Sequence, residues 1–146
     1  MTQNTIWGVV AISVMLAVGS AQAADQGGKS LYDRLGGKGA ITAVVETFVG
    51  KVGGDVRINS YFKSTDLVKL KAHLVNQICE ASGGPCKYTG RTMKQTHAGM
   101  GVSDAAFGAL VEDLVGALDH HKVGKAEKDE LLGVLGPMKS DIVEKK

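Results

Sequence analysis

The sequence predicts an all-α fold with a single domain, and three observations support this prediction. Apolar residues recur at the three- and four-residue spacing of an amphipathic helix in several stretches between positions 30 and 143. No stretch shows the two-residue alternation that is typical of a half-buried strand. Residues that favour helix N-termini precede these stretches, and glycines follow several of them. We expect four substantial helices and two or three short ones.

The first part of the domain is predicted to contain a short helix and then two long ones. A capping-box pattern begins at Ser30, and Gly36-Gly37 ends the short helix. The next helix covers about residues 38–52, and its apolar side consists of Ile41, Val44, Val45, Phe48 and Val49. A cap at Ser64-Thr65-Asp66 begins the third helix, whose apolar stripe consists of Leu67, Leu70, Leu74 and Ile78.

The second part is predicted to contain a loop, a short helix and two longer helices. Residues 82–92 are rich in glycine, proline, serine and threonine and are expected to form the loop, and residues 93–98 the short helix. Ser103 caps the helix with the clearest pattern, which consists of Phe107, Leu110, Val111, Leu114, Val115 and Leu118. The last helix is expected over about residues 126–143, where Pro137 either kinks it or ends it early.

The composition excludes several classes of protein. The chain has 146 residues, of which 44% are hydrophobic, and this argues for one folded domain and against disorder. Its 17 Lys and Arg residues and 15 Asp and Glu residues give a net charge of +2 without a long basic run. We therefore expect no nucleic-acid partner. No nucleophile motif, phosphate-binding loop or zinc-binding pattern occurs in the sequence.

Residues 1–23 are typical of a signal peptide. An apolar run from Ile6 to Val18 precedes Ala21-Gln22-Ala23, whose small residues fit the site that signal peptidase cleaves. The run is shorter than the roughly 20 apolar residues of a membrane span. We expect a mature domain of residues 24–146 that is periplasmic or secreted, with no stable membrane insertion after cleavage. Because the segment from Met1 to Trp7 contains no Lys or Arg, an uncleaved anchor is the alternative.

The two cysteines, Cys79 and Cys86, both lie in the part of the chain that we expect to be exported. An even number of cysteines in an oxidising compartment favours a disulfide, which here would close the turn at Gly83-Gly84-Pro85. Two free thiols are the alternative. Neither cysteine belongs to a Cys-x-x-Cys or Cys-x-x-Cys-His motif, which disfavours thioredoxin chemistry and covalent haem attachment.

The histidines are the most informative polar residues. His97 follows Met93 by one helical turn and precedes two glycines, so its imidazole could be presented to a flat apolar ligand. His73 could face it from the edge of an apolar stripe. For each of these histidines an ordinary structural or surface role is the alternative. His120-His121 is expected at the C-terminal end of the Ser103 helix, where positive charge suits the helix dipole.

The sequence around these histidines resembles the truncated haemoglobins, and specifically the first group of that family. The resemblance extends over essentially all of residues 30–143. It depends on several segments taken together, which are Leu31-Tyr32-Asp33-Arg34-Leu35-Gly36-Gly37, Phe62, Gly83-Gly84-Pro85, Tyr88-Thr89-Gly90 and Met93-Lys94-Gln95-Thr96-His97-Ala98-Gly99-Met100-Gly101. It implies a shortened globin fold, in which two antiparallel helix pairs form a two-over-two sandwich around haem b (iron protoporphyrin IX).

The resemblance also implies roles for individual residues. His97 matches the proximal histidine, which is the axial ligand of the iron. Met93 matches a haem contact on the same side, and Phe62 matches the phenylalanine that packs on the porphyrin. The remaining pocket positions, which are mainly on the opposite, distal side, are occupied by Phe48, Val49, Leu70, His73, Leu74 and Ile78.

The distal side departs from the pattern of many members of the group. Val49 stands where many members have a tyrosine, and Leu74 stands where they have a glutamine. Neither side chain can donate a hydrogen bond to a gas ligand. The loss of a charge-assisted hydrogen bond costs about 1.5–3 kcal/mol, or roughly one to two decades of affinity for oxygen. High-affinity oxygen storage is therefore doubtful unless His73 supplies the donor.

His73 matches the position that coordinates the iron itself in some members of the family. It is the basic side chain in an otherwise apolar distal pocket, and an apolar environment favours the neutral imidazole that a metal binds. We therefore hypothesise that both His97 and His73 are metal ligands and that the resting iron is six-coordinate.

The sequence leaves several functions open. The leading interpretation is an exported haem globin that binds oxygen, nitric oxide or carbon monoxide reversibly. A second is nitric oxide dioxygenation, an enzymatic activity that would need an unidentified reductase partner. A third is electron transfer or redox sensing by a bis-histidine haem. A fourth is a haem-free helical interaction module, which would purify colourless and would not bind added haemin.

Overall fold

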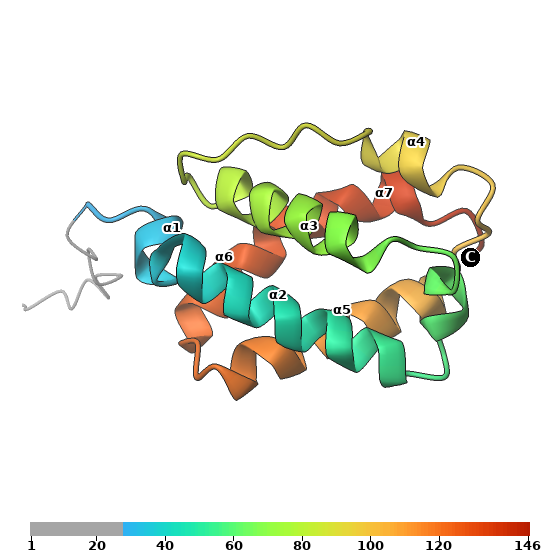
Figure 1. Cartoon of the computed structure of the whole chain (residues 1–146), viewed down its shortest axis with the longest axis horizontal. Helices are drawn as coiled ribbons and strands as arrows, with labels where there is room; N and C mark the ends of the chain where they lie inside the picture. The colour runs from blue at the N-terminus through green and yellow to red at the C-terminus, as the bar shows by residue number, and fades with distance from the viewer. Residues whose placement is uncertain (1–27) are drawn as a thin grey trace, which may run out of the picture.

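The computed structural model describes residues 28–146, and within this range the chain consists of helices, turns and loops (Figure 1). The elements are α1 (Leu31–Arg34), α2 (Gly37–Gly54), η1 (Asn59–Phe62), α3 (Leu67–Ala81), α4 (Met93–His97), α5 (Asp104–His120), α6 (Lys125–Leu135), η2 (Gly136–Met138) and α7 (Lys139–Ile142). The predicted signal peptide lies outside the described residues. Among residues 28–146, no helix is long and apolar enough to span a bilayer.

The predicted starts of α1, α3 and α5 are confirmed, and each of these three depends on a side chain that binds free backbone N–H groups. Ser30 and Asp33 form a reciprocal capping box at α1. Asp66 accepts hydrogen bonds from the N–H groups of Val68 and Lys69 at the start of α3, and Ser103 caps α5. These contacts satisfy donors that have no partner inside the helix, which is why the caps were recognisable in the sequence.

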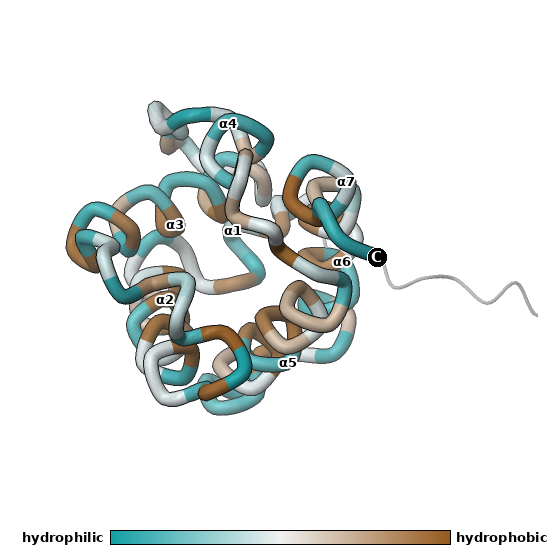
Figure 2. Tube along the Cα trace, turned by 90° about the vertical axis from the view of Figure 1, so that its right-hand side faces the viewer, coloured by the Kyte–Doolittle hydropathy of each residue, from teal (hydrophilic) through white to brown (hydrophobic). Residues whose placement is uncertain are grey.

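The long helices pack as the periodic patterns predicted. The central helix α2 packs against α3 on one side and against α5 on the other. Its apolar residues are buried and join residues of α3, α5 and α6 in one core cluster, which includes Ile41, Val45, Phe48, Ile78, Leu118 and Leu131. The loop after α3 returns along that helix to α4, which lies beside α7 (Figure 1). Figure 2, which views the molecule end on, shows α2, α3, α4, α7, α6 and α5 arranged in a ring.

The last predicted helix ends early at Pro137, which is one of the two outcomes that the sequence left open. Helix α6 ends at Leu135, the 3-10 turn η2 contains Pro137, and α7 begins at Lys139. Proline has no backbone N–H and its ring clashes with the preceding helical turn, which explains the break. After this break, α7 contacts α4.

Candidate functional site

A pocket of about 1050 Å³ opens between the helices of the ring. Its volume is at the upper end of the range for small-molecule and cofactor sites. All the residues that the sequence assigned to the site line it, namely Phe48, Val49, Phe62, Leu70, His73, Leu74, Ile78, Met93 and His97. The fold therefore brings together side chains from α2, η1, α3 and α4.

His97 is the last residue of α4, and its ring has a defined orientation. A capping box between Thr92 and Gln95 begins this short helix. The Nδ1 atom of His97 lies 2.7 Å from the carbonyl oxygen of Met93. Because a carbonyl can only accept a hydrogen bond, Nδ1 carries the proton, and Nε2 keeps the lone pair that a metal needs. The half-buried imidazole is thus prepared for coordination through Nε2.

His73 lines the same pocket from α3. Its ring meets the ring of Tyr88 edge to face, with centroids 5.7 Å apart and planes inclined at 71°. Tyr88 is itself fixed, because its hydroxyl donates to the carbonyl of Arg91 at 2.7 Å and its N–H donates to Glu80 at 3.0 Å. The aromatic contact restrains the second imidazole of the site.

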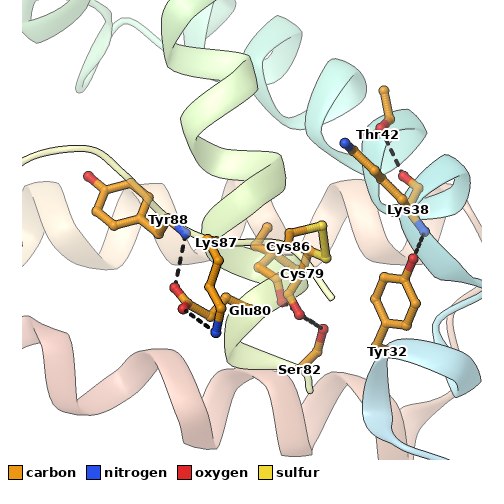
Figure 3. The surroundings of a disulfide bond; sticks show 10 residues. Tyr32, Lys38, Thr42, Cys79, Glu80, Ser82, Cys86, Lys87 and Tyr88 are labelled. Carbon is orange, nitrogen blue, oxygen red and sulfur yellow. Dashed lines mark hydrogen bonds and ion pairs between the residues drawn. A yellow bond between two sulfur atoms is a disulfide. The ribbon is translucent and has the colours of Figure 1, made fainter. Parts of the chain in front are cut away.

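The disulfide predicted between Cys79 and Cys86 is confirmed, and it fastens the loop that carries Tyr88 (Figure 3). Within the turn that it closes, the N–H of Gly84 donates to the carbonyl of Cys79 at 2.7 Å. Lys87 forms an ion pair with Glu80 at 3.5 Å. The bond therefore ties the end of α3 to residues 88–91, which line the pocket.

The wall formed by Val49, Leu70 and Leu74 offers no hydrogen-bond donor from its side chains. Val49 is only 6% exposed, and Leu70 and Leu74 are half-buried. Such a wall excludes water and disfavours charge.

Sequence analysis missed several residues of the pocket. Gln77 follows His73 by one helical turn, and its amide nitrogen lies 3.3 Å from the sulfur of Met138 and 3.5 Å from that of Met93. The four-residue spacing between His73 and Gln77 could have indicated that Gln77 faces the same pocket. Tyr88 lies in a loop, where no periodicity shows which side chains turn inwards. The basic residues of the lining are Lys63, Lys69, Arg91 and Lys139.

The other two histidines lie outside the pocket lining, at the C-terminal end of α5 where the sequence placed them. The Nε2 atom of His121 lies 2.8 Å from the hydroxyl of Thr47 on α2. Among residues 28–146, no group of three or more His, Cys, Asp or Glu side chains is placed to hold a metal ion by itself.

Comparisons with known proteins agree with this geometry. The bacterial-like globin family matches residues 30–144. The group 1 truncated hemoglobin GlbN of Mycolicibacterium paratuberculosis is 37% identical over 113 residues, which are 77% of this chain and 83% of that protein. The group 1 truncated hemoglobin of Tetrahymena pyriformis is 31% identical over 117 residues, which are 80% of this chain and 97% of that protein.

Solved structures show the same fold. The Fe(III) form of the truncated hemoglobin from Tetrahymena pyriformis superimposes with a TM-score of 0.76 at 30% identity, and it covers 79% of this chain and 98% of that one. The 2/2 hemoglobin from Synechococcus, whose heme is covalently attached, gives a TM-score of 0.75 at 34% identity and covers 80% of this chain and 100% of that one.

Apart from the comparisons, the side chains that line the pocket fit haem. A histidine that is oriented through Nδ1, a large apolar cavity and basic side chains in its lining suit a flat, apolar iron complex with acidic edge groups. The haem-free interpretation therefore no longer stands, and the two-over-two sandwich predicted from the sequence is confirmed. The chain belongs to the bacterial-like globins, as a relative of the group 1 truncated haemoglobins, and its cofactor is haem.

Proposed function

We propose that this protein is an exported haem globin that binds diatomic gases reversibly, with His97 as the axial ligand of the iron. The observation that carries the proposal is the 2.7 Å hydrogen bond from Nδ1 of His97 to the Met93 carbonyl. This bond selects the tautomer whose Nε2 is free for a metal and sets the direction of the ring. Membership of the globin family supports oxygen and related gases as ligands.

The chain supports this function in three ways: it orients His97, it keeps water out of the pocket, and it provides basic side chains for the porphyrin carboxylates. When bound, haem supplies an iron atom with a coordination position for a gas molecule. Phe48, Val49 and Ile78 are buried in the pocket wall and exclude water from that position. Lys63, Lys69 and Arg91 are exposed pocket residues that can pair with the carboxylates of the porphyrin.

His73 supports a second candidate function, electron transfer or redox sensing. It lines the pocket on α3, in contact with Tyr88, while its neighbours Leu70 and Leu74 offer no competing polar group. We propose that its imidazole takes the sixth coordination position of the resting iron. An iron held by two imidazoles suits transfer of single electrons, whereas gas binding requires His73 to leave.

Visible absorption spectra of the haem-loaded protein test both assignments. We expect sharp low-spin bands from the reduced wild-type protein without oxygen, and a broad high-spin band from His73→Ala. His97→Ala should lose haem or depend on added imidazole. His120→Ala is the matched control, because His120 is exposed and lies outside the pocket lining, and its spectrum should equal that of the wild type.

The outcomes separate the two histidines. A wild-type spectrum and full haem content in His97→Ala would contradict the proposed axial ligand. A reduced wild-type protein that is already high-spin would contradict coordination by His73 and leave gas binding intact. Reversible spectral change on adding and removing oxygen favours the gas-binding function. A reduced spectrum that does not change when oxygen or carbon monoxide is added favours electron transfer, because His73 then keeps the coordination position.

Export rests on the pattern of residues 1–23 and is supported by the disulfide. Structural disulfides form and persist in oxidising compartments and are rare in the cytosol. Fractionation of cells that express the full chain should place the protein in the periplasm or the medium, with Ala24 as its first residue. A protein that retains Met1 and sediments with membranes would instead indicate the uncleaved anchor.

A further inference from the structure

The segment that follows His97 has little structure of its own. The helix α4 has only five residues, and a helix of this length is not stable in isolation. Beyond it, Gly99 and Gly101 adopt positive φ values of 79° and 65°, a left-handed conformation that glycine adopts without strain. A ligand at the end of so short a helix needs a restraint from elsewhere in the chain.

Glu144 provides direct contacts to this segment. Its Oε1 accepts a hydrogen bond from the N–H of Gly99 at 2.6 Å, and its Oε2 accepts one from the N–H of Gly101 at 2.7 Å. Hydrogen bonds of this kind are strong because the acceptor carries a charge. The N–H groups of Gly99 and Gly101 hold the pKa of the Glu144 carboxyl below its usual range, so the group is ionised at neutral pH.

The backbone around Glu144 is itself anchored. The N–H groups of Glu144 and Lys145 both donate to the carbonyl of Val102, at 2.8 and 3.1 Å. The N–H of Asp104, at the start of α5, donates to the carbonyl of Lys145 at 3.0 Å. Glu144 thus follows α7, which contacts α4 and contributes Ile142 to the pocket, while its carboxylate holds the chain just after His97.

We propose that Glu144 is a positioning residue of the haem site, which fixes the segment after His97 and thereby holds the imidazole in place for the iron. Glu144 does not line the pocket, so it acts through the backbone of residues 99–101 and not by touching haem. The inference rests on the proposed role of His97 as the axial ligand. Removing a group that orients a metal ligand typically weakens metal binding 10- to 100-fold.

The first test compares Glu144→Ala, Glu144→Gln and the control Asp141→Ala. Asp141 is an exposed carboxylate on α7 for which the described residues provide no ion pair or hydrogen-bond partner, so its removal changes charge without touching residues 99–101. We expect haem transfer from Glu144→Ala to an acceptor apoglobin to be about tenfold faster than from wild type. Glu144→Gln retains a carbonyl oxygen that can accept one N–H and should be intermediate, and Asp141→Ala should equal wild type.

A second readout distinguishes positioning from general stability. We expect the amide protons of Gly99 and Gly101 to exchange at least about tenfold faster in haem-loaded Glu144→Ala, since each would lose its acceptor. In the His73→Ala background, the iron–imidazole stretching band should shift or broaden on Glu144→Ala. A variant with a lower unfolding temperature but unchanged haem transfer and an unchanged stretching band would overturn the proposal.

The same measurements test the role of His97 independently of Glu144. If His97→Ala made in the His73→Ala background keeps the iron–imidazole band, the proposed axial ligand is wrong, whatever Glu144 does. If His97→Ala loses the band while Glu144→Ala behaves as wild type, only the positioning role of Glu144 fails.

Discussion

The ring of Tyr88 lies edge-on against the ring of His73, with 5.7 Å between their centroids. The two residues belong to different segments that a covalent bond joins, because Tyr88 follows Cys86 by two residues and Cys86 is bonded to Cys79 on α3. His73, the disulfide and Tyr88 therefore form one connected unit on the wall of the haem pocket. This arrangement gives a loop residue control over the orientation of an imidazole.

Removal of the Tyr88 ring should free His73. An aromatic pair contributes about 0.5–1.5 kcal/mol beyond its buried area. Under the proposed coordination of the iron by His73, Tyr88→Ala should therefore lower the population of His73 bound to iron by roughly two- to tenfold. Rapid mixing of the reduced protein with carbon monoxide measures this population, because His73 must dissociate before the gas binds. The association should be faster in Tyr88→Ala.

Tyr88→Phe provides the control for that experiment. It keeps the ring beside His73 and removes only the hydroxyl that donates to Arg91. It should bind carbon monoxide at nearly the wild-type rate. Equal rates for Tyr88→Ala and wild type would show that the aromatic contact does not restrain His73.

The disulfide should stabilise the folded protein, because it reduces the conformational entropy of the unfolded chain. A bridge between residues seven apart contributes about 2–3 kcal/mol in the chain-entropy treatment. We expect the double variant Cys79→Ser, Cys86→Ser to unfold at a correspondingly lower urea concentration. A thiol reductant should destabilise the wild type by a similar amount and leave the double variant unchanged. Reductant sensitivity of the double variant would point to a cause other than this bond.

The helices were predictable because their signals are local. Caps such as Ser30, Asp66 and Ser103 act within three residues, and the apolar faces repeat every helical turn. Pro137 indicated that the last helix would be disturbed, but the sequence alone left open whether that helix would bend or end. The residues of the pocket were predictable from resemblance, since the spacing around His97 by itself favoured a structural role.

The residues that were missed depend on contacts between distant segments. Tyr88 turns inwards because the disulfide and the hydrogen bond to Glu80 fix its loop. Glu144 reaches Gly99 because α7, which follows the 3-10 turn at Pro137, packs against α4. Neither of these contacts produces a periodic pattern in the sequence, so each can be recognised only in the folded chain.

Gly84 should be intolerant of a side chain. A Cβ atom at this position would lie 2.5 Å from Cδ2 of Tyr32, 2.7 Å from the sulfur of Cys79 and 2.8 Å from its carbonyl oxygen. Forced contacts of this kind in a packed region cost about 1–3 kcal/mol, so Gly84→Ala should lower the free energy of unfolding by that amount. Urea unfolding monitored by circular dichroism measures it.

Gly133→Ala is the matched control for Gly84→Ala. Gly133 lies inside α6, and no atom lies within 4 Å of an added Cβ. Alanine is favoured over glycine by about 1 kcal/mol in a helix interior, so this variant should be more stable than wild type. If both variants shifted stability in the same direction, the steric explanation for Gly84 would fail.

Asp113 and Asp55 form a pair of carboxyl groups with opposite pKa shifts. Burial and then the charge of Asp55 raise the pKa of Asp113, and one of its oxygens is buried without a hydrogen-bond partner. The hydrogen bonds of Arg57 lower the pKa of Asp55. Folding therefore disfavours the ionised form of Asp113 and favours the ionised form of Asp55.

The sign of the pH dependence follows from these directions. A raised folded-state pKa means that Asp113 costs stability above that pKa and costs nothing below the ordinary value of about 3.9, where both states are protonated. Asp113→Asn should therefore be more stable than wild type at pH 7, by less than about 1 kcal/mol because the side chain is partly exposed. The difference should vanish as the pH falls through the acidic range.

Asp55→Asn should behave in the opposite way. Its lowered folded-state pKa contributes stability that is present above the ordinary value and is lost as the pH falls through the folded-state value. This variant should be less stable than wild type at pH 7 and approach it in acid. Urea unfolding of the three proteins at neutral and acidic pH measures both trends. If Asp113→Asn destabilised the protein at pH 7, burial and the charge of Asp55 would not be what decides the stability contribution of Asp113, and the repulsive pairing with Asp55 would have to be abandoned.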